Sequence, residues 1–370
     1  MRSPLLSEQT LSAFSDTYAS ARQQFLKAVD ALPRPVFLQT LDYTGAGPQG
    51  ETLATDVLWL GDQDARKVVV VLSAVHGVEG FAGSAIQTDL LRRLASGEAK
   101  LPDGLALAIV HAVNPWGFAW CRRVDEQGID INRNFVDFSQ PLPRNDGYRA
   151  LADALIPADG DWQRADATLA HYMQAHGQFN YEVAASGGQY EFADGLFYGG
   201  HAPAQARRNL EWVLNRWDWS NREVAVIDLH TGLGPYGYGE LICDHPLGSE
   251  GLHTARRWFG ASATVPEEGN SCSVPKLGLV DYAWHAILGR NSCYVTLEYG
   301  TFPIAGLLRT LREDHAVRKP GPHDWNDPAS AQVRDRLRLH FYPGESQWQT
   351  LVLLRARQVV QLACTGLLQN

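Results

Sequence analysis

The sequence lacks a cysteine framework. Its 370 residues include only five cysteines, an odd number, and no two of them have the C-x-x-C spacing of a zinc finger or a redox pair. Small domains that depend on disulfides are much richer in cysteine. We therefore expect reduced thiols and a cytoplasmic location. The N-terminal MRSPLLSEQT, which lacks the basic-then-apolar pattern of a secretion signal, favours the same expectation.

Long apolar runs and an excess of basic residues are missing as well. The longest strongly apolar run, Val68–Val75, has eight residues, whereas a membrane-spanning helix needs about 20. The 32 basic and 41 acidic residues give a formal net charge of −9, so no basic stripe is available to neutralise a nucleic-acid backbone. The sequence therefore predicts no membrane partner and no nucleic-acid partner.

Three common motifs of hydrolases and nucleotide-binding enzymes are also absent. The chain has no G-x-S-x-G elbow, no H-E-x-x-H pair and no G-x-x-x-x-G-K loop. Serine-hydrolase, thermolysin-type and P-loop chemistries consequently have no support. Glycine and tryptophan, in contrast, are abundant, with 34 and 11 residues. Many tight turns around an aromatic core favour a loop-rich enzyme.

Short β-branched runs predict a buried sheet. Four of them are apolar and uninterrupted, as in parallel strands that are covered on both faces. Val36–Tyr43 and Thr52–Leu60 alternate instead and predict a hairpin, while the spacing of apolar residues predicts one amphipathic helix over Glu8–Leu32. We therefore expect an α/β fold with a mixed, mostly parallel sheet flanked by helices. The four apolar runs are Lys67–Val75, Leu105–Val113, Val224–Leu229 and Cys293–Leu297.

A polar or turn-forming group follows each of these four runs. In open α/β sheets, ligands bind in the crevice outside the carboxyl ends of the strands. The four groups are therefore expected to line one site. They are His76-Gly77, Asn114-Pro115, His230-Thr231 and Glu298-Tyr299.

The first of these groups has the spacing of a metal site. His76 and Glu79 are three residues apart at a strand-to-helix junction, and side chains at positions i and i+3 of a helical turn point the same way. Zinc accepts imidazole and carboxylate ligands, and a hydrolytic zinc site uses three protein ligands with water in the fourth position. His230, just past another apolar strand, is the natural third ligand.

Further polar residues fit amide hydrolysis. Asn132 and Arg133 supply an amide and a guanidinium fork, which suit a terminal carboxylate. Arg123 suits the oxyanion that forms when water attacks a carbonyl. Glu298, at a strand end, suits a general base for an activated water.

These residues, in this order, resemble the zinc carboxypeptidase family of carboxypeptidase A-like metallopeptidases, with its related aspartoacylase and succinylglutamate desuccinylase group. The likeness covers about Lys67 to Gly300, and Asn114–Phe135 is similar to the pattern NPxG…R…DxNRNF. The resemblance implies a carboxypeptidase-like fold and one zinc ion held by His76, Glu79 and His230.

The family also implies the other roles. Arg123 would polarise the carbonyl, Asn132 and Arg133 would bind the substrate carboxylate, and Glu298 would be the general acid/base. Asp130 would hold His76 in its ligating tautomer. The expected substrate is a small peptide or, alternatively, an N-acyl amino acid cleaved by an aspartoacylase-like deacylase. A remote alternative is an inactive metal- or peptide-binding module.

Two assignments stay open, and the rest of the chain is expected to complete the domain. The oxyanion residue could be Arg122 in place of Arg123, although the gap to Asn132 favours Arg123. The family's substrate-capping tyrosine has three candidates. We expect a single metallohydrolase domain over residues 1–370, a loop-rich insertion near the site at 141–200 and a C-terminal helical extension at 319–370. The candidate tyrosines are Tyr236, Tyr238 and Tyr282.

Overall fold

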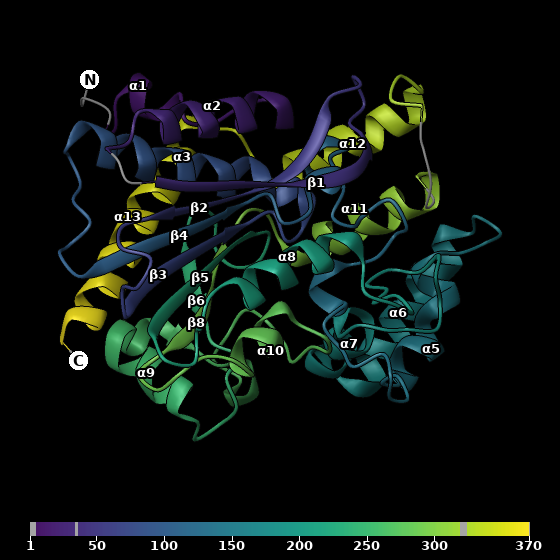
Figure 1. Cartoon of the computed structure of the whole chain (residues 1–370). Helices are drawn as coiled ribbons and strands as arrows, with labels where there is room; N and C mark the ends of the chain where they lie inside the picture. Colours follow the sequence, from purple (N-terminus) through teal and green to yellow (C-terminus); the bar gives the residue numbers. More distant parts are fainter. Residues whose placement is uncertain (1–4, 34–35, 319–323, 370) are drawn as a thin grey trace.

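A computed structural model of the chain describes residues 5–33, 36–318 and 324–369 (Figure 1). Its centre is an eight-stranded sheet with the order β1-β2-β4-β3-β5-β8-β6-β7. The strands are β1 (Val36–Ala46), β2 (Thr52–Leu60), β3 (Lys67–Ser73), β4 (Leu105–His111), β5 (Glu223–Thr231), β6 (Gly239–Ile242), β7 (Ala263–Thr264) and β8 (Cys293–Tyr299).

The four predicted apolar runs form the middle of this sheet. β4, β3, β5 and β8 are neighbours and pair in parallel. β1 and β2 form the predicted antiparallel hairpin, and β2 pairs antiparallel with β4. On the other side, β6 pairs antiparallel with β8 and parallel with the short β7. The prediction of a mixed, mostly parallel sheet flanked by helices is confirmed.

Helices cover both faces of the sheet. α3 (Gly80–Ser96) and α13 (Ser346–Gln369) pack against β3 and β5, and α2 (Tyr18–Asp30) packs on α3. On the other side of the strands in Figure 1 lie α8 (Gln205–Arg216) and α10 (Val280–His285). The remaining helices are α1 (Glu8–Leu11), α4 (Pro115–Ala119), α5 (Asp146–Leu155), α6 (Trp162–His176), α7 (Gln178–Ser186), α9 (Glu250–Phe259), α11 (Ile304–Val317) and α12 (Pro328–Phe341), with short 3-10 turns η1 (Gly77–Glu79), η2 (Ile131–Arg133), η3 (Gly260–Ser262) and η4 (Pro266–Glu268).

The N-terminal helix differs from the prediction. The segment expected as one helix over Glu8–Leu32 is divided into α1 and α2. Thr17 has an extended backbone, and its side-chain hydroxyl accepts the N–H of Ser20. Such an N-cap starts a new helix, because it satisfies a donor that has no partner inside the helix.

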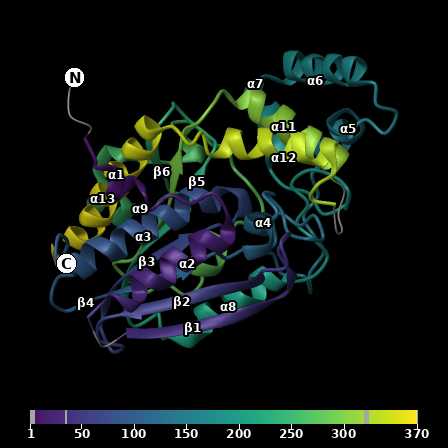
Figure 2. The same cartoon turned by 90° about the horizontal axis from the view of Figure 1, so that it is seen from above.

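The segment 141–200, expected to be rich in loops, contains three helices instead. α5, α6 and α7 lie together at one end of the molecule (Figures 1 and 2). Asn145 caps α5 by accepting the N–H of Tyr148, and Asp161 caps α6 by accepting the N–H of Arg164. The loop prediction was wrong: α6 and α7 bury only two residues each, which leaves a weak apolar pattern in their sequence, although α5 buries Tyr148, Leu151, Ala154 and Leu155.

The C-terminal segment contains two helices that pack against the rest of the domain. Residues 324–369 contain α12 and α13, while residues 319–323 of the expected extension lie outside the described part of the chain. α13 passes alongside α3 and contacts β3, β5 and β6. Among the described residues, α13 is also the one helix whose length and composition would suffice to cross a membrane. Its contacts place Trp348, Val352 and Val359 in the core beside the sheet.

Several of the abundant tryptophans pack together on the sheet. Trp59 on β2 stacks on Trp217 with ring centroids 4.6 Å apart and an interplanar angle of 25°. Trp219 lies against Trp217, and Trp284 lies against Trp219 at 5.2 Å. Aromatic pairs of this kind add to the stabilisation from burial. This cluster connects the hairpin edge of the sheet with α10.

Candidate active site

The turn after β3 places two of the predicted metal ligands. His76 precedes η1, and Glu79 ends it directly before α3. The turn is fixed by hydrogen bonds from the N–H groups of Gly77 and Val78 to the carbonyls of Arg123 and Arg122. Gly77 must be glycine here, because a Cβ at this position would lie 2.1 Å from the carbonyl carbon of Gly117.

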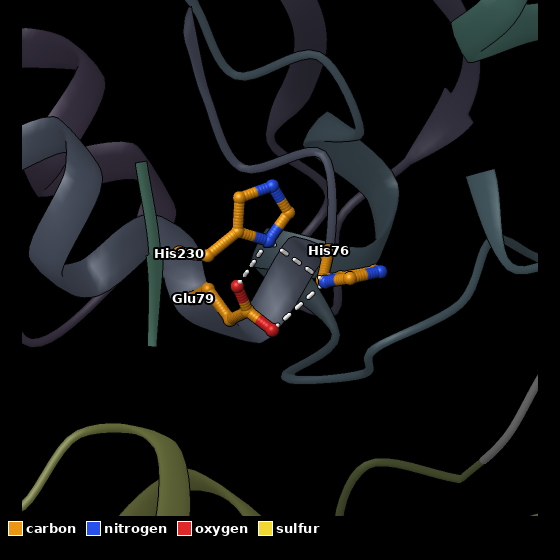
Figure 3. A group of neighbouring side chains, drawn as sticks. All are labelled: His76, Glu79 and His230. Carbon is orange, nitrogen blue, oxygen red and sulfur yellow. Dashed lines mark hydrogen bonds and ion pairs between the residues drawn. The ribbon is translucent and has the colours of Figure 1, made fainter. Parts of the chain in front are cut away.

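The structure brings His76, Glu79 and His230 together (Figure 3). One ligand atom from each residue lies within 4.8 Å of the others, and all three side chains are buried. His76 Nδ1 is 2.9 Å from Glu79 Oε1, and His230 Nδ1 is 2.9 Å from Glu79 Oε2. The two Nδ1 atoms are 3.1 Å apart. Two imidazole nitrogens and a carboxylate therefore face one point, a donor set that suits zinc.

The other ring nitrogen of each histidine contacts an aspartate. His76 Nε2 is 3.1 Å from Asp130 Oδ1, and His230 Nε2 is 2.7 Å from Asp228 Oδ2. Such carboxylates fix the tautomer of a ligating histidine and leave the opposite nitrogen for a metal. Asp130 was predicted, whereas Asp228 was missed. The sequence signal for Asp228 was its position two residues before His230 on the same strand, which puts both side chains on the same face.

The charges around these ligands favour a cation. Burial lowers the pKa of His230, but Asp228 and Glu79 outweigh it and hold that pKa well above its usual value. For Glu79 burial acts in the opposite direction, yet His76 and His230 lower its pKa strongly. Both shifts have the same cause, which is the opposite charge of the neighbouring groups. The two imidazoles and the carboxylate are donors that suit a divalent cation.

The two adjacent arginines have different surroundings. Arg123 Nε donates to Asp130 Oδ2 at 3.0 Å, and its Nη1 donates to Glu79 Oε1 at 3.4 Å. Arg122 points away and forms a buried ion pair with Asp314 of α11, with Nε 3.0 Å from Oδ2. Arg123 therefore borders the metal-ligand group, and Arg122 belongs to the packing between the site loop and α11.

Asn132 and Arg133 lie on η2 and line a cavity that His76, Glu79 and His230 also line. Asp130 caps this turn by accepting the N–H of Asn132 at 3.0 Å. The side chain of Asn132 accepts the N–H of Val280 at 2.8 Å. Arg133 is fully buried, and its guanidinium donates to the carbonyl oxygens of Asn132 and Ser186 at 2.5 and 2.9 Å. Its Nε has no hydrogen-bond partner among the described residues.

Glu298 is the last residue but one of β8 and lies opposite His230 in the register of β5 and β8. Its Oε1 accepts the N–H of Leu233 at 2.9 Å. The side chain is 7% exposed, and burial, followed by the nearby Glu79 carboxylate, raises the pKa of Glu298 to about 7. A carboxyl group with such a pKa can both accept and donate a proton near neutrality.

Seven of these side chains border one cavity of about 510 Å³: His76, Glu79, Arg123, Asn132, Arg133, His230 and Glu298. Further ionisable residues that the sequence did not single out line it as well, among them Asp244, Lys276 and Asp281. Burial, followed by the nearby Arg133, lowers the pKa of Lys276 to about 8. The Lys276 ammonium donates to the carbonyl of Val274 at 2.8 Å. No spacing signal in the sequence connects these positions with the metal ligands.

The candidate capping tyrosines differ in their positions. Tyr282 is 41% exposed, and its hydroxyl donates to the carbonyl of Lys276 at 2.7 Å, next to the cavity. The hydroxyl of Tyr236 instead donates to Glu345 at 2.8 Å. Tyr238 is 48% exposed. Of the three, Tyr282 is the one bonded to a residue that lines the cavity.

A known protein family matches most of this chain. The family model described as "Protein of unknown function (DUF2817)" matches residues 14–355. No curated protein matches the sequence.

Several solved structures have a similar fold. The structure of thrombin activatable fibrinolysis inhibitor aligns with a TM-score of 0.51 at 12% identity, over 98% of this chain and 77% of that one. Carboxypeptidase A from Helicoverpa armigera aligns with a TM-score of 0.47 at 14% identity, over 95% and 74%. Succinylglutamate desuccinylase from Chromobacterium violaceum aligns with a TM-score of 0.36 at 15% identity, over 87% and 74%. The first alignment shows the carboxypeptidase-like α/β fold that the resemblance implied.

Proposed function

The chain belongs to the family described as a protein of unknown function (DUF2817), and we propose that it is a zinc-dependent hydrolase of an amide bond next to a free carboxylate. The proposal includes a single metallohydrolase domain that uses one zinc ion. The observation that carries it is the convergence of His76, Glu79 and His230 on one point, with Glu298 and Arg123 beside the same cavity. Each group needed for turnover is therefore present at one place.

The proposed ligands are His76 Nδ1, His230 Nδ1 and the carboxylate of Glu79. A zinc ion held by them would supply Lewis acidity, which lowers the pKa of a water molecule and polarises a carbonyl group. Asp130 and Asp228 hold the two imidazoles in orientation through their Nε2 atoms. The main-chain N–H of Thr231 donates to Glu79 Oε2 at 3.1 Å and fixes the third ligand.

Glu298 is the proposed general acid/base. Its carboxylate takes a proton from the attacking water while the new C–O bond forms at the carbonyl carbon. It then returns this proton to the nitrogen of the leaving amine as the C–N bond breaks. One amide and one water thus give one carboxylic acid and one amine. The hydrogen bond from Leu233 holds the Glu298 side chain in place.

Arg123 is the proposed oxyanion donor. Its guanidinium is held by Asp130 and lies against the ring of Phe197, with the guanidinium carbon 5.4 Å from the ring centroid. A positioned guanidinium stabilises the negative charge that develops on the carbonyl oxygen in the transition state. The side chain is 11% exposed, so little water competes for this charge.

Asn132 and Arg133 are proposed to bind the free carboxylate of the substrate. Arg133 lines the cavity, and its guanidinium is held there by the carbonyls of Asn132 and Ser186. Lys276, half-buried in the same cavity, adds a second cation. Two cations in one cavity favour an anionic group on the substrate.

Two substrate classes fit this mechanism. A carboxypeptidase-like reaction on a small peptide is the leading form. An aspartoacylase-like deacylation of an N-acyl amino acid is the second, and the apolar residues that line part of the cavity support it. An inactive binding module is disfavoured, because such a module would not need the buried Glu298.

Metal loading and one substitution test the proposal. The purified protein, loaded with zinc and dialysed, should contain one zinc ion per chain. Glu298→Gln should retain this zinc but lose hydrolysis of peptides and N-acyl amino acids. A protein that binds no divalent ion, or a Glu298→Gln variant with the turnover of the wild type, would contradict the proposed mechanism.

A matched set of substrates tests the carboxylate-binding residues. Each peptide and each N-acyl amino acid is assayed with a free carboxylate and as its carboxamide. The free acids should be preferred, because Asn132, Arg133 and Lys276 gather on that side of the cavity. Equal rates for the acid and the carboxamide would remove this role from the three residues.

A further inference from the structure

The cavity extends from the proposed metal ligands into an apolar chamber that residues of α6, α7 and α11 line together. The chamber is defined here by six of its lining residues. Three come from α6 and α7, and three come from α11. They are Leu169, Met173, Tyr181, Leu307, Leu308 and Leu311.

The chamber is continuous with the reaction site. Gly232 directly follows β5 and lies two residues after His230. A Cβ at Gly232 would lie 3.7 Å from Leu307 Cδ2 of the chamber. At the other wall, the carbonyl of Ser186 at the end of α7 accepts from Arg133 at 2.9 Å. The apolar walls therefore begin directly beside the metal-ligand group and the carboxylate-binding residues.

Four polar side chains around the chamber already have partners: Arg312, Asp166, Gln178 and Glu182. Arg312 of α11 donates to Asp166 at 2.6 Å and to the carbonyls of Leu155 and Ala154 at 2.8 and 2.9 Å. Gln178 donates to Glu182 on α7. These walls thus present mainly alkyl and aromatic groups. A bound peptide would bury main-chain N–H and C=O groups against these walls, and each unpaired group would cost free energy.

We propose that the chamber binds the alkyl chain of an N-acyl amino acid, so that the enzyme removes medium-length fatty acyl groups from amino acids. This inference rests on the proposed hydrolase function and deepens it. An alkyl chain needs no hydrogen-bond partner and gains from leaving water. The reaction adds one water across the amide bond and releases a fatty acid and a free amino acid. The whole cavity, which includes the chamber and the reaction site, has a volume of about 510 Å³, within the usual range for a site that encloses a small ligand.

A chain-length series tests the occupant of the chamber. The zinc-loaded enzyme is assayed with acetyl, butyryl, hexanoyl, octanoyl and decanoyl derivatives of one amino acid. If each added methylene is buried, kcat/KM should rise by about fourfold per methylene until the chamber is filled. A rate that is highest for the acetyl derivative would overturn the inference but leave the hydrolase proposal standing. No hydrolysis of any substrate would instead contradict the hydrolase proposal.

Binding gives a readout that does not depend on turnover. Isothermal titration of the metal-free protein with the same N-acyl amino acids should show tighter binding and a more negative heat-capacity change as the chain lengthens. Affinity that does not change with chain length would overturn the inference, even if the loaded enzyme proves active.

One substitution and a matched control locate the effect. Leu308→Asp adds a charge to the chamber wall at a half-buried helical position and should flatten the dependence on chain length in both assays. Leu354→Asp makes the same change at a 38% exposed leucine of α13, outside the residues that line the cavity, and should retain the slope of the wild type. Equal slopes in the two variants would place the alkyl chain elsewhere.

Discussion

Two neighbouring arginines show how single residues with the same chemistry take different roles. Arg122 and Arg123 leave the same loop, but only Arg123 faces the metal-ligand group. Arg122 is 1% exposed and pairs with Asp314, which also bonds to Arg318. Burial of the Arg122–Asp314 pair makes this arginine a structural residue, because an uncompensated buried charge is costly.

Replacing each arginine by methionine should separate the two roles. Arg122→Met should lower the free energy of unfolding by roughly 3 kcal/mol, at the lower end for a broken buried pair because Arg318 still holds Asp314. Arg123→Met should instead lower kcat by roughly 10²–10³-fold through loss of an oxyanion donor. Urea unfolding and steady-state kinetics measure the two effects. The assignment would be reversed if the Arg122→Met variant were folded but lost as much turnover as is expected of Arg123→Met.

Asp125 is a buried acid on the loop between Arg123 and Asp130. Its Oδ1 accepts the N–H groups of Gln127 and Ile129 at 2.9 and 2.8 Å, while Oδ2 has no partner among the described residues. Burial, followed by the nearby Glu126, raises the pKa of Asp125 to about 8. The protonated form is therefore the one that the folded loop favours.

This raised pKa predicts a fall in stability with increasing pH. The unfolded chain releases the proton near pH 4 and the folded chain near pH 8, so the stabilisation is complete below about pH 4 and is lost as the pH rises toward 8. Relative to Asp125→Asn, the wild type should lose roughly 1.4 kcal/mol of unfolding free energy per pH unit in this window. Urea titrations at several pH values measure this difference. Parallel pH curves for the two proteins would exclude the raised pKa.

At the scale of elements, the short turns at strand ends carry the site. η1 holds His76 and Glu79 in place because its backbone packs directly on α4, where Gly77 approaches Gly117. This contact belongs to the fold and not to the local sequence, since the two glycines are 40 positions apart in the chain. The geometry of the metal ligands therefore depends on a backbone-to-backbone contact.

Gly77→Ala should disturb this contact and the metal site together. The added Cβ would meet the backbone of Gly117, so the variant should lose roughly 1–3 kcal/mol of stability and bind zinc more weakly. Gly306→Ala is the matched control, because a Cβ in the first turn of α11 would meet only the His340 side chain, at 3.3 Å, and that side chain needs to move by only a few tenths of an ångström. This control should stay within about 1 kcal/mol of the wild type. Thermal unfolding and zinc titration test both, and normal zinc affinity in Gly77→Ala would contradict the argument.

At the scale of the whole molecule, the buried charges of the site are a cost that a cation can offset. Glu79, Asp130 and Asp228 are each at most 2% exposed, and they surround two histidines. A metal ion that binds only the folded chain stabilises it by mass action. The proposed site should therefore couple metal binding to the stability of the whole fold.

Zinc should accordingly raise the unfolding free energy of the whole chain. At a free concentration of 100 times Kd, the increase should be about 2.7 kcal/mol, and removal of the metal with a chelator should reverse it. His76→Ala should abolish the increase, whereas His253→Ala, at an exposed position of α9, should retain it. Unfolding curves with and without zinc measure these differences. A zinc-independent stability of the wild type would contradict the site.

The sequence by itself determined the central sheet and the positions of the proposed metal ligands. Uninterrupted β-branched runs are typical of parallel strands that are buried on both faces, and the carboxyl ends of such strands meet at one edge. His76, Glu79, His230 and Glu298 were therefore identifiable from their places after these runs, and the structure brings them to one cavity.

Only the tertiary structure decided the rest. Which arginine faces the site depends on the distant Asp314, and Lys276 and Asp244 reach the cavity from loops with no pattern that links them to it. The apolar chamber needs α7 and α11, which are separated by more than a hundred residues and whose periodicity does not name their partner. Strand-end chemistry is local and can be read along the chain, whereas the substrate-binding walls arise from long-range packing.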